Sequence, residues 1–328
     1  MAKVRTDDPR LQALRLGEQA TAGQFIPRPD RRAAVARTLR RPQFWFGVTV
    51  LIPTLIWYWI FSFQPIFSAF WIAVHKYQVL APSTSPFIGF DNFRYLWANP
   101  LFLVAVRNTL LWGVLAFTLT LPLALLLSVC LANVARGRNL YQFFIFLPVV
   151  VSLVAITLLF RMLMDPDIGQ FNTILNALGL HSWTWLSDSS SALPTAVGIG
   201  VWKGIGGTVV LLTAGMLNIP AELQDAALVD GANEWQRFWK ITLPLLSHTL
   251  VLVMVLLAIG SLQEFTLPQL LSTSGAGNSL YVLNILIYNE AFQNLRFGTA
   301  TAAALLQFAF ILVISMVQLK LIRPKWSY

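Results

Sequence analysis

The sequence predicts an all-α polytopic membrane protein with six transmembrane helices. Of its 328 residues, 56% are hydrophobic and only 11% are charged, whereas a soluble domain is about 25% charged. Six mostly apolar runs each approach the ~20 residues that a helix needs to span ~30 Å of hydrocarbon. Lys and Arg gather in alternate segments between these runs, as expected when the chain crosses a membrane repeatedly.

The six predicted spans divide the chain into a tail and one membrane domain. Residues 1–43 carry Pro, Arg, Asp and Gln without apolar periodicity and are predicted to form a cytoplasmic N-terminal tail, and residues 44–328 form the transmembrane domain. The first span is longer than one membrane thickness at ~1.5 Å per residue, so we expect Pro53 and Pro65 to kink it and part of it to lie at the interface. The predicted spans are about 44–74, 105–131, 141–164, 192–215, 246–266 and 297–319.

The positions of the basic residues predict the orientation. Ten of the 23 Lys and Arg precede residue 44, and the segments assigned to the inside hold 17 of them against three in the outer loops. Cytoplasmic loops carry this excess, so both termini are predicted to be cytoplasmic. The net charge of +9 therefore indicates a tail facing anionic lipid and not a nucleic-acid partner.

The predicted cytoplasmic loop 218–245, between the fourth and fifth spans, is unusually polar. It is predicted to contain two short helices. Pro220 suits a first helical turn, and Glu222 and Asp225 lie where the helix dipole favours negative charge. The loop therefore has the features of an ordered surface element and not of a simple connection.

The middle of the same loop combines small residues with a turn. Ala226 and Ala227 are expected to present a smooth surface, and Gly231 allows a positive φ or the close approach of another backbone. A second amphipathic segment begins near Trp235. Pro244 is expected to mark the return into the membrane.

The loop resembles a known motif. Asp225, Ala226, Ala227, Gly231, Ile241, Leu243 and Pro244 follow the spacing of the EAA loop of binding-protein-dependent ABC importer permeases, Glu-Ala-Ala-x3-Gly-x9-Ile-x-Leu-Pro, with Asp in place of Glu. Softer resemblances to the carbohydrate-importing branch occur at 88–96, 146–150, 235–239, 287–292 and 297–298. The chain is thus similar to the permeases that import maltose and glycerol phosphate.

This resemblance implies a type I ABC importer permease fold in a bacterial or archaeal inner membrane. It also implies partners: a second, non-identical permease, two ATPase subunits and an extracytoplasmic solute-binding protein. The chain has no Gly-x4-Gly-Lys-[Ser/Thr] loop, so ATP and Mg²⁺ would be bound by the partner ATPase and no cofactor is expected in this chain. The expected substrate is a sugar or oligosaccharide, with a phosphorylated polyol such as a glycerol phosphate left open.

The resemblance also gives each part of the loop a role. Glu222, Asp225, Ala226, Ala227, Gly231, Ile241, Leu243 and Pro244 would couple the spans to the ATPase. The short helix would move as a rigid body when the ATPase pair closes, switching the spans between inward-open and outward-open states.

Polar side chains inside the predicted spans are candidate substrate contacts, because they are costly in hydrocarbon. A sugar needs amide, carboxylate and hydroxyl partners and an aromatic face. By resemblance, Gly204, Ser261 and Glu264 match substrate-contacting positions, while close packing and an ion pair between Lys203 and Glu264 are the structural alternative. The candidates are Trp202, Lys203, Gly204 and Thr208 in the fourth span, and Ser261, Gln263 and Glu264 in the fifth.

Other functional classes fit less well. His75, His181 and His248 are far apart in the sequence, so neither a metal site nor a catalytic residue is expected. A membrane-embedded sugar transferase would need acidic or histidine clusters at the membrane edge. A transporter driven by an ion gradient would leave the cytoplasmic helix pair unexplained.

Overall fold

The computed structural model describes residues 42–134, 136–272 and 275–321, and these are almost entirely helices and their connections. One isolated β-bridge joins His75 to Phe87. The chain separates into two units, residues 1–65 and 66–328, which are described one at a time. Apart from Pro42 and Gln43, the predicted N-terminal tail lies outside the described residues.

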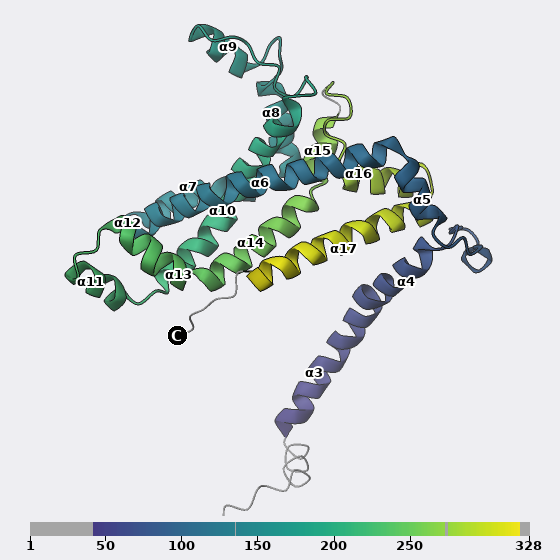
Figure 1. Ribbon diagram of the computed structural model, residues 1–328, viewed down its shortest axis with the longest axis horizontal. Coiled ribbons are helices and arrows are strands. Elements are labelled where there is room, and N and C mark those ends of the chain that lie inside the picture. Colours follow the sequence, from purple (N-terminus) through teal and green to yellow (C-terminus); the bar gives the residue numbers. More distant parts are fainter. Residues whose placement is uncertain (1–41, 135, 273–274, 322–328) are drawn as a thin grey trace, which may run out of the picture. The chain divides into compact units, whose positions relative to one another are not determined.

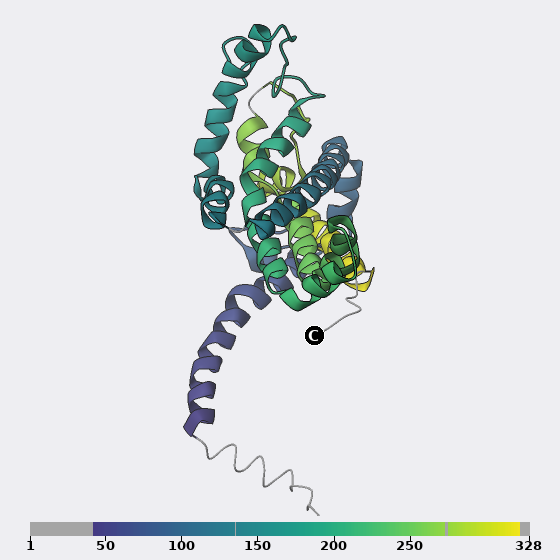
Figure 2. The ribbon, with the colours of Figure 1, turned by 90° about the vertical axis from the view of Figure 1, so that its left-hand side faces the viewer.

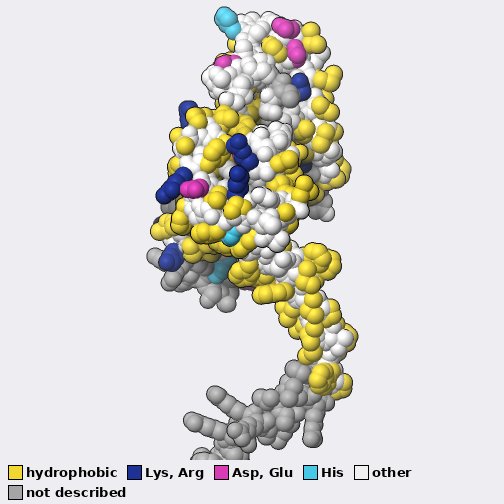
Figure 3. Space-filling view, turned by 90° about the vertical axis from the view of Figure 1, so that its right-hand side faces the viewer, with side chains coloured by type: hydrophobic (Ala, Val, Ile, Leu, Met, Phe, Trp, Pro, Cys, Tyr) yellow, Lys and Arg dark blue, Asp and Glu magenta, His cyan; other side chains and the backbone are white. Residues whose placement is uncertain are grey.

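The first unit contains α3 (Pro42–Tyr58) and the π-helix η1 (Trp59–Phe63). Pro53 lies inside α3, and η1 ends just before Pro65, whose missing N–H and ring disrupt regular i to i−4 bonding. Hydrophobic side chains cover this helix (Figure 3). It is part of a 29-residue helix, Trp45–Ala73, that is long and apolar enough to cross a membrane.

The second unit is built on long apolar helices. α6 packs along α10 and α14, and α14 packs along α17 (Figures 1 and 2). The described residues contain five helices that could cross a membrane, or six if one bent pair counts as a single span, which confirms the predicted all-α polytopic class. The long helices of this unit are α6 (Pro100–Asn133), α10 (Ala192–Leu217), α14 (Ser247–Leu262) with the short α15 (Thr266–Leu271), and α17 (Phe297–Leu321).

The bent pair lies where the sequence predicts an uninterrupted span at 141–164. The structure instead has α7 (Arg138–Val150) and α8 (Leu153–Leu163), which meet at 90°. Pro148 removes one backbone donor near the end of α7 and crowds the preceding turn, and Val151 is extended with ψ 142°. A helix that loses a bond so close to its end stops there, so the predicted third span is divided into two helices.

Short helices occupy both ends of the second unit. In Figure 1, α5, α16 and the start of α17 lie at one end, while α11 and α12 lie at the other. The first group comprises α4 (Gln64–Ala73, of which 66–73 belong here), η2 (Pro82–Thr84), α5 (Asp91–Ala98), α16 (Leu283–Tyr288) and η5 (Asn289–Gln293). The second comprises α11 (Ala221–Val229), α12 (Glu234–Arg237), η3 (Phe238–Thr242) and α13 (Leu243–Leu245). The short α9 (Gln170–Ala177) lies beyond α8, apart from both groups.

Three buried clusters hold the second unit together. One surrounds Trp112 and joins α6, α8, α10 and α15, and one around Phe102 joins α6 to α16 and α17. The third surrounds Leu212 and joins α6, α10 and α14. Because α6 contributes to all three clusters and α10 to two of them, these two packed helices form the centre of this unit.

Candidate functional site

The C-terminus of α11 is fixed by a glycine turn. Gly231 has φ +77°, its N–H donates to the carbonyl of Leu228 at 3.0 Å, and the N–H of Ala232 donates to that of Ala227 at 2.9 Å. This pair of bonds is typical of a helix that ends on a left-handed residue. A Cβ at Gly231 would meet no atom within 4 Å, so within this chain the positive φ, and not a lack of space, favours glycine.

The two helices of the loop begin in different ways. The sequence predicts Pro220 in the first turn of α11, whereas in the structure Pro220 is the N-cap residue, one position earlier. Glu222 lies in the first turn, as predicted. The second helix starts with a capping box in which Asn233 and Gln236 bond to each other's backbone N–H at 2.8 and 3.0 Å. This helix runs through η3 and α13 almost directly into α14. Pro244 therefore lies inside a helical run that leads into α14.

α11 exposes most of its side chains. The expected smooth surface of two alanines is half correct, because Ala226 is exposed whereas Ala227 is buried. Val229 is 88% exposed and Leu228 52%, which is costly for apolar side chains facing water. The exposed side chains of this helix, beyond its first residue, are Glu222, Leu223, Asp225, Ala226, Leu228 and Val229.

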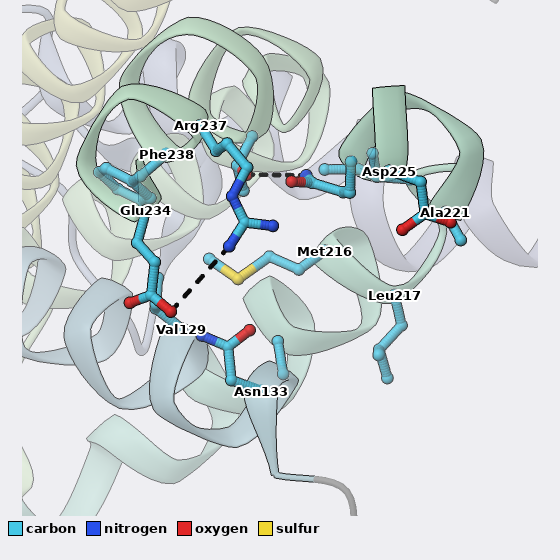
Figure 4. Close-up of a pocket in the computed structure, with 13 residues that line it drawn as sticks. Val129, Asn133, Met216, Leu217, Ala221, Asp225, Glu234, Arg237 and Phe238 are labelled. Atoms are coloured by element: carbon cyan, nitrogen blue, oxygen red, sulfur yellow. Dashed lines mark hydrogen bonds and ion pairs between the residues drawn. The ribbon is translucent and has the colours of Figure 1, made fainter. Parts of the chain in front are cut away.

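A cavity of ≈400 Å³ lies between α11, α12 and η3 and the C-terminal ends of α6 and α10 (Figure 4). The Gln224 side chain donates to the hydroxyl of Thr242 at 3.1 Å and so links α11 to η3. Arg237 reaches into the cavity and pairs with Glu234 at 4.0 Å. Ile241, Leu243 and Pro244 are half-buried beside this cavity wall. The loop is thus attached to the spans, yet its outer face is free.

A second cavity of ≈190 Å³ lies between α6, α10 and α14. Gly204, Ser261 and Glu264, three of the predicted substrate contacts, line it together. The Glu264 carboxylate accepts from the N–H of Leu267 at 3.3 Å, and the Ser261 hydroxyl donates to the carbonyl of Ala258 at 3.3 Å. The cavity therefore brings hydroxyl and carboxylate groups together among apolar helices.

The proposed ion pair between Lys203 and Glu264 is wrong. Lys203 Nζ donates to the backbone carbonyl of Val149 on α7 at 3.1 Å, and these two charged side chains form no salt bridge. Successive residues of an α-helix point about 100° apart, so Lys203 faces α7 while Gly204 faces the cavity. Trp202 is also turned away, with its ring 5.3 Å from that of Phe160.

The remaining predicted contacts do not line this cavity. Thr208 is buried elsewhere on α10, and the Gln263 side chain is exposed while its backbone carbonyl accepts from Asn284. Sequence reasoning missed Trp112 and Thr120, which α6 contributes to the cavity wall. Neither residue belongs to the polar cluster of their helix, which is Arg107, Asn108 and Thr109, so the sequence did not indicate them. In the described ranges, no group of three or more His, Cys, Asp or Glu side chains could hold a metal ion.

The fold places the chain among membrane transport permeases. It matches a chain in the crystal structure of a bacterial ABC transporter involved in the import of the acidic polysaccharide alginate, with TM-score 0.77 and 27% sequence identity over 87% of this chain and 97% of that one. This similarity confirms the predicted importer permease fold. Residues 120–328 match the family of binding-protein-dependent transport system inner membrane components. The chain belongs to that family, and so is a multi-pass inner-membrane component of a transport system.

Relatives extend the match over most of the chain. The probable ABC transporter permease protein YurN of Bacillus subtilis is 30% identical over 82% of this chain and 93% of its own length. The trehalose/maltose transport system permease protein MalF of Thermococcus litoralis is 29% identical over 84% and 92%. The sn-glycerol-3-phosphate transport system permease protein UgpA of Pectobacterium atrosepticum is 28% identical over 89% and 99%. These are near full-length similarities.

Proposed function

We propose that this chain forms half of the translocation pathway of an ATP-driven importer and is moved by a separate ATPase through α11. The observation that carries this proposal is the surface of α11, where acidic side chains such as Asp225 lie beside exposed Leu228 and Val229. An exposed apolar group on an ordered helix favours a protein partner. The turn at Gly231 and the Gln224 to Thr242 bond connect that surface to α12 and η3, which lead into α14.

The proposed substrate is a sugar or oligosaccharide. Glu264 and Ser261 supply hydrogen-bonding groups at the intramembrane cavity, and Trp112 supplies an aromatic ring, the combination that a sugar needs. The trehalose/maltose relative and the alginate importer support this class. A phosphorylated polyol is a second candidate, favoured by the similarity to the sn-glycerol-3-phosphate permease.

The proposal includes partners and an orientation. A second, non-identical permease would complete the pathway, two ATPase subunits would bind ATP and Mg²⁺, and a solute-binding protein would deliver substrate. The alginate importer has been crystallised with its substrate-bound periplasmic protein, which supports the last of these. We place α11 and both termini in the cytoplasm, because the basic residues favour that side.

Substitutions at Gly231 test the coupling role. Gly231→Val should uncouple ATP hydrolysis from uptake or release the ATPase, because a β-branched residue strongly disfavours φ +77°. Gly231→Asn is the matched variant, because asparagine tolerates a positive φ far better. The measurements are the amount of ATPase that copurifies with the tagged permease and the uptake of sugar per ATP hydrolysed in proteoliposomes.

The two variants separate two reasons for glycine. If only the backbone conformation matters, Gly231→Asn retains coupling and Gly231→Val loses it. If the ATPase approaches the Cα closely, both variants lose coupling although both insert normally. Normal coupled uptake by Gly231→Val would refute a coupling role for this turn.

A further inference from the structure

A third cavity, separate from both sites above, lies between the first turns of α6, the start of α10 and the connection after α15. Its volume is ≈830 Å³, within the ~300–1,000 Å³ typical of ligand pockets, whereas the intramembrane cavity is only ≈190 Å³. Its polar lining consists of Arg107, Asn108, Ser187, Asp188, Ser189, Ser190, Asn278 and Ser279. Hydroxyl, amide and charged groups of both signs therefore converge here.

Arg107 is the cation of this cavity, and its position suits a ligand arriving from outside the membrane. Its side chain is exposed and makes no hydrogen bond or ion pair with the described residues. α6 is 34 residues long, about 50 Å at ~1.5 Å per residue, so it exceeds the ~30 Å hydrocarbon layer. No charged residue follows Arg107 in this helix, which places the guanidinium at the end of the apolar core.

Asp188 is the anion of the same cavity, and its own loop holds it in place. The hydroxyls of Ser190 and Ser189 donate to its carboxylate. The Ser190 hydroxyl bond is the largest effect and lowers the pKa of Asp188; desolvation raises it by less, and the backbone N–H groups of Ser190 and Ser189 lower it further. The carboxylate thus stays ionised at neutral pH, with a fixed direction in which it can accept hydrogen bonds.

Side-chain hydrogen bonds hold the walls of the cavity. Asn108 is buried, and its amide donates to the backbone carbonyls of Asn278 at 2.8 Å and Tyr281 at 3.2 Å. Opposite, the Ser191 hydroxyl donates to the carbonyl of Trp185 at 2.7 Å. Asn108 thus holds the connection after α15 against α6, and Ser191 holds the loop before α10, so each wall is ordered without a ligand.

We propose that this outer cavity is a second carbohydrate site, which takes a sugar bearing an acidic group, either a carboxylate or a phosphate. This inference rests on the proposed importer function and adds a substrate class to it. Arg107 pairs with the acidic group through its planar set of donors. Asp188 accepts hydrogen bonds from the sugar hydroxyls, and Asn278 with the serines completes the set.

A lipid headgroup is the competing source of an anion for Arg107. Arginine at the end of a membrane helix often contacts lipid phosphate. That role would not need a carboxylate held in the same cavity, nor a lining of serine and asparagine side chains. A sugar uses all of these groups, which is why we favour it.

Binding to the purified importer complex in phosphatidylcholine nanodiscs tests the proposal. The probes are galacturonic acid and glucose 6-phosphate, compared with neutral galactose and glucose. In the wild type we expect an acidic probe that binds to have an affinity at least about tenfold higher than that of its neutral counterpart. The reason is that a charge-assisted, bidentate pair with Arg107 is among the stronger hydrogen bonds. The probe that binds distinguishes carboxylate from phosphate.

Three variants test which residues cause the preference for acidic probes. Arg107→Gln should remove the preference for acid, Arg107→Lys should retain only part of it, and Asp188→Asn should weaken acidic and neutral probes alike. Arg94→Gln is the matched control, because Arg94 is an exposed arginine of the same unit that pairs with Asp91 at 3.1 Å and does not line the cavity.

The outcomes separate this inference from the importer proposal. Equal binding of acidic and neutral probes, no binding of either acidic probe, or an unchanged preference in Arg107→Gln would overturn the acidic-sugar site. An effect of Arg107→Gln that appears only when anionic lipid is added would assign the arginine to lipid instead. Failure of the importer proposal shows differently, as absence of a copurifying ATPase in the wild type.

Discussion

The two ends of the second unit are secured in different ways. At the end that holds α5 and the start of α17, the buried side chain of Asn92 donates to the backbone carbonyls of Ala73 at 2.7 Å and His75 at 3.1 Å, and accepts from the Thr299 hydroxyl at 3.3 Å. One amide thereby joins three segments. Gly298 lies against the backbone carbonyl of His75, because a Cβ added at Gly298 would be 2.5 Å from that oxygen.

The helix α11, at the other end, has much less of this. The side-chain bond from α11 to another element that the structure shows is Gln224 to Thr242, while Leu228 and Val229 are left exposed. Secondary elements with few buried contacts open more readily than a hydrogen-bonded core. The difference teaches that one end keeps its shape unaided, whereas the other leaves a surface for a partner to cover.

Replacing Asn92 should give the largest effect, on stability. Asn92→Leu leaves the carbonyls of Ala73 and His75 without their amide partner, and a buried group left unsatisfied costs about 1–3 kcal/mol. We expect the free energy of unfolding to fall by about 3 kcal/mol. The measurement is unfolding by SDS titration in mixed micelles.

The control for this prediction is Asn176→Ala. Asn176 is exposed and accepts a hydrogen bond from the Ser182 hydroxyl at 3.0 Å, so its loss should change stability by no more than about 0.5 kcal/mol. If the two variants were equally stable, the view that buried amides secure this end would fail.

What could be predicted from the sequence follows from the range of the forces involved. The turn at Gly231 is local, since it depends on bonds within five residues, and its spacing indicated it. The Asn92 junction joins residues 207 positions apart, so periodicity and spacing could not reveal it, although resemblance had marked the segments 88–96 and 297–298. Composition and the apolar runs were enough for the all-α polytopic class, because the membrane requires every spanning segment to satisfy its backbone as a helix.

Side-chain direction set the limit for the intramembrane site. The sequence indicated the polar part of α10 but not which way each residue points. Of its candidate substrate contacts, Gly204 lines one cavity with Glu264, whereas Lys203 points to the carbonyl of Val149. The break in the third span was missed for a similar reason. A proline such as Pro148 is tolerated in many membrane helices, and its presence alone does not say whether the helix ends there.

Changing the exposed surface of α11 should give a smaller effect, on assembly and not on stability. Val229→Ser should leave the unfolding free energy within about 0.5 kcal/mol, because the side chain is 88% exposed. Association with the ATPase should weaken several-fold, since apolar contacts at an interface contribute about 1 kcal/mol or more. Copurification at increasing salt and binding of the purified ATPase measure this.

Leu80→Ser is the matched control for that surface. Leu80 is fully exposed and lies in the connection between α4 and η2, so its replacement should affect neither stability nor ATPase binding. Equal ATPase binding by Val229→Ser and the wild type would remove α11's apolar group from the interface and leave its acidic residues to explain docking.

The smallest expected effect is the coupling between Lys203 and Glu264. An ion pair would make Lys203→Met or Glu264→Gln damaging alone and let the double variant recover. The structure gives the two side chains separate partners, the carbonyl of Val149 and the N–H of Leu267. We therefore expect their effects on unfolding to add within about 0.5 kcal/mol. Recovery of stability in the double variant by more than about 1 kcal/mol would support an ion pair after all.

The single variant Glu264→Gln tests the sugar path. It should reduce the stimulation of ATPase by loaded binding protein, with yield unchanged, because Glu264 lines the intramembrane cavity. Full stimulation in Glu264→Gln would show that the carboxylate takes no part in the sugar path.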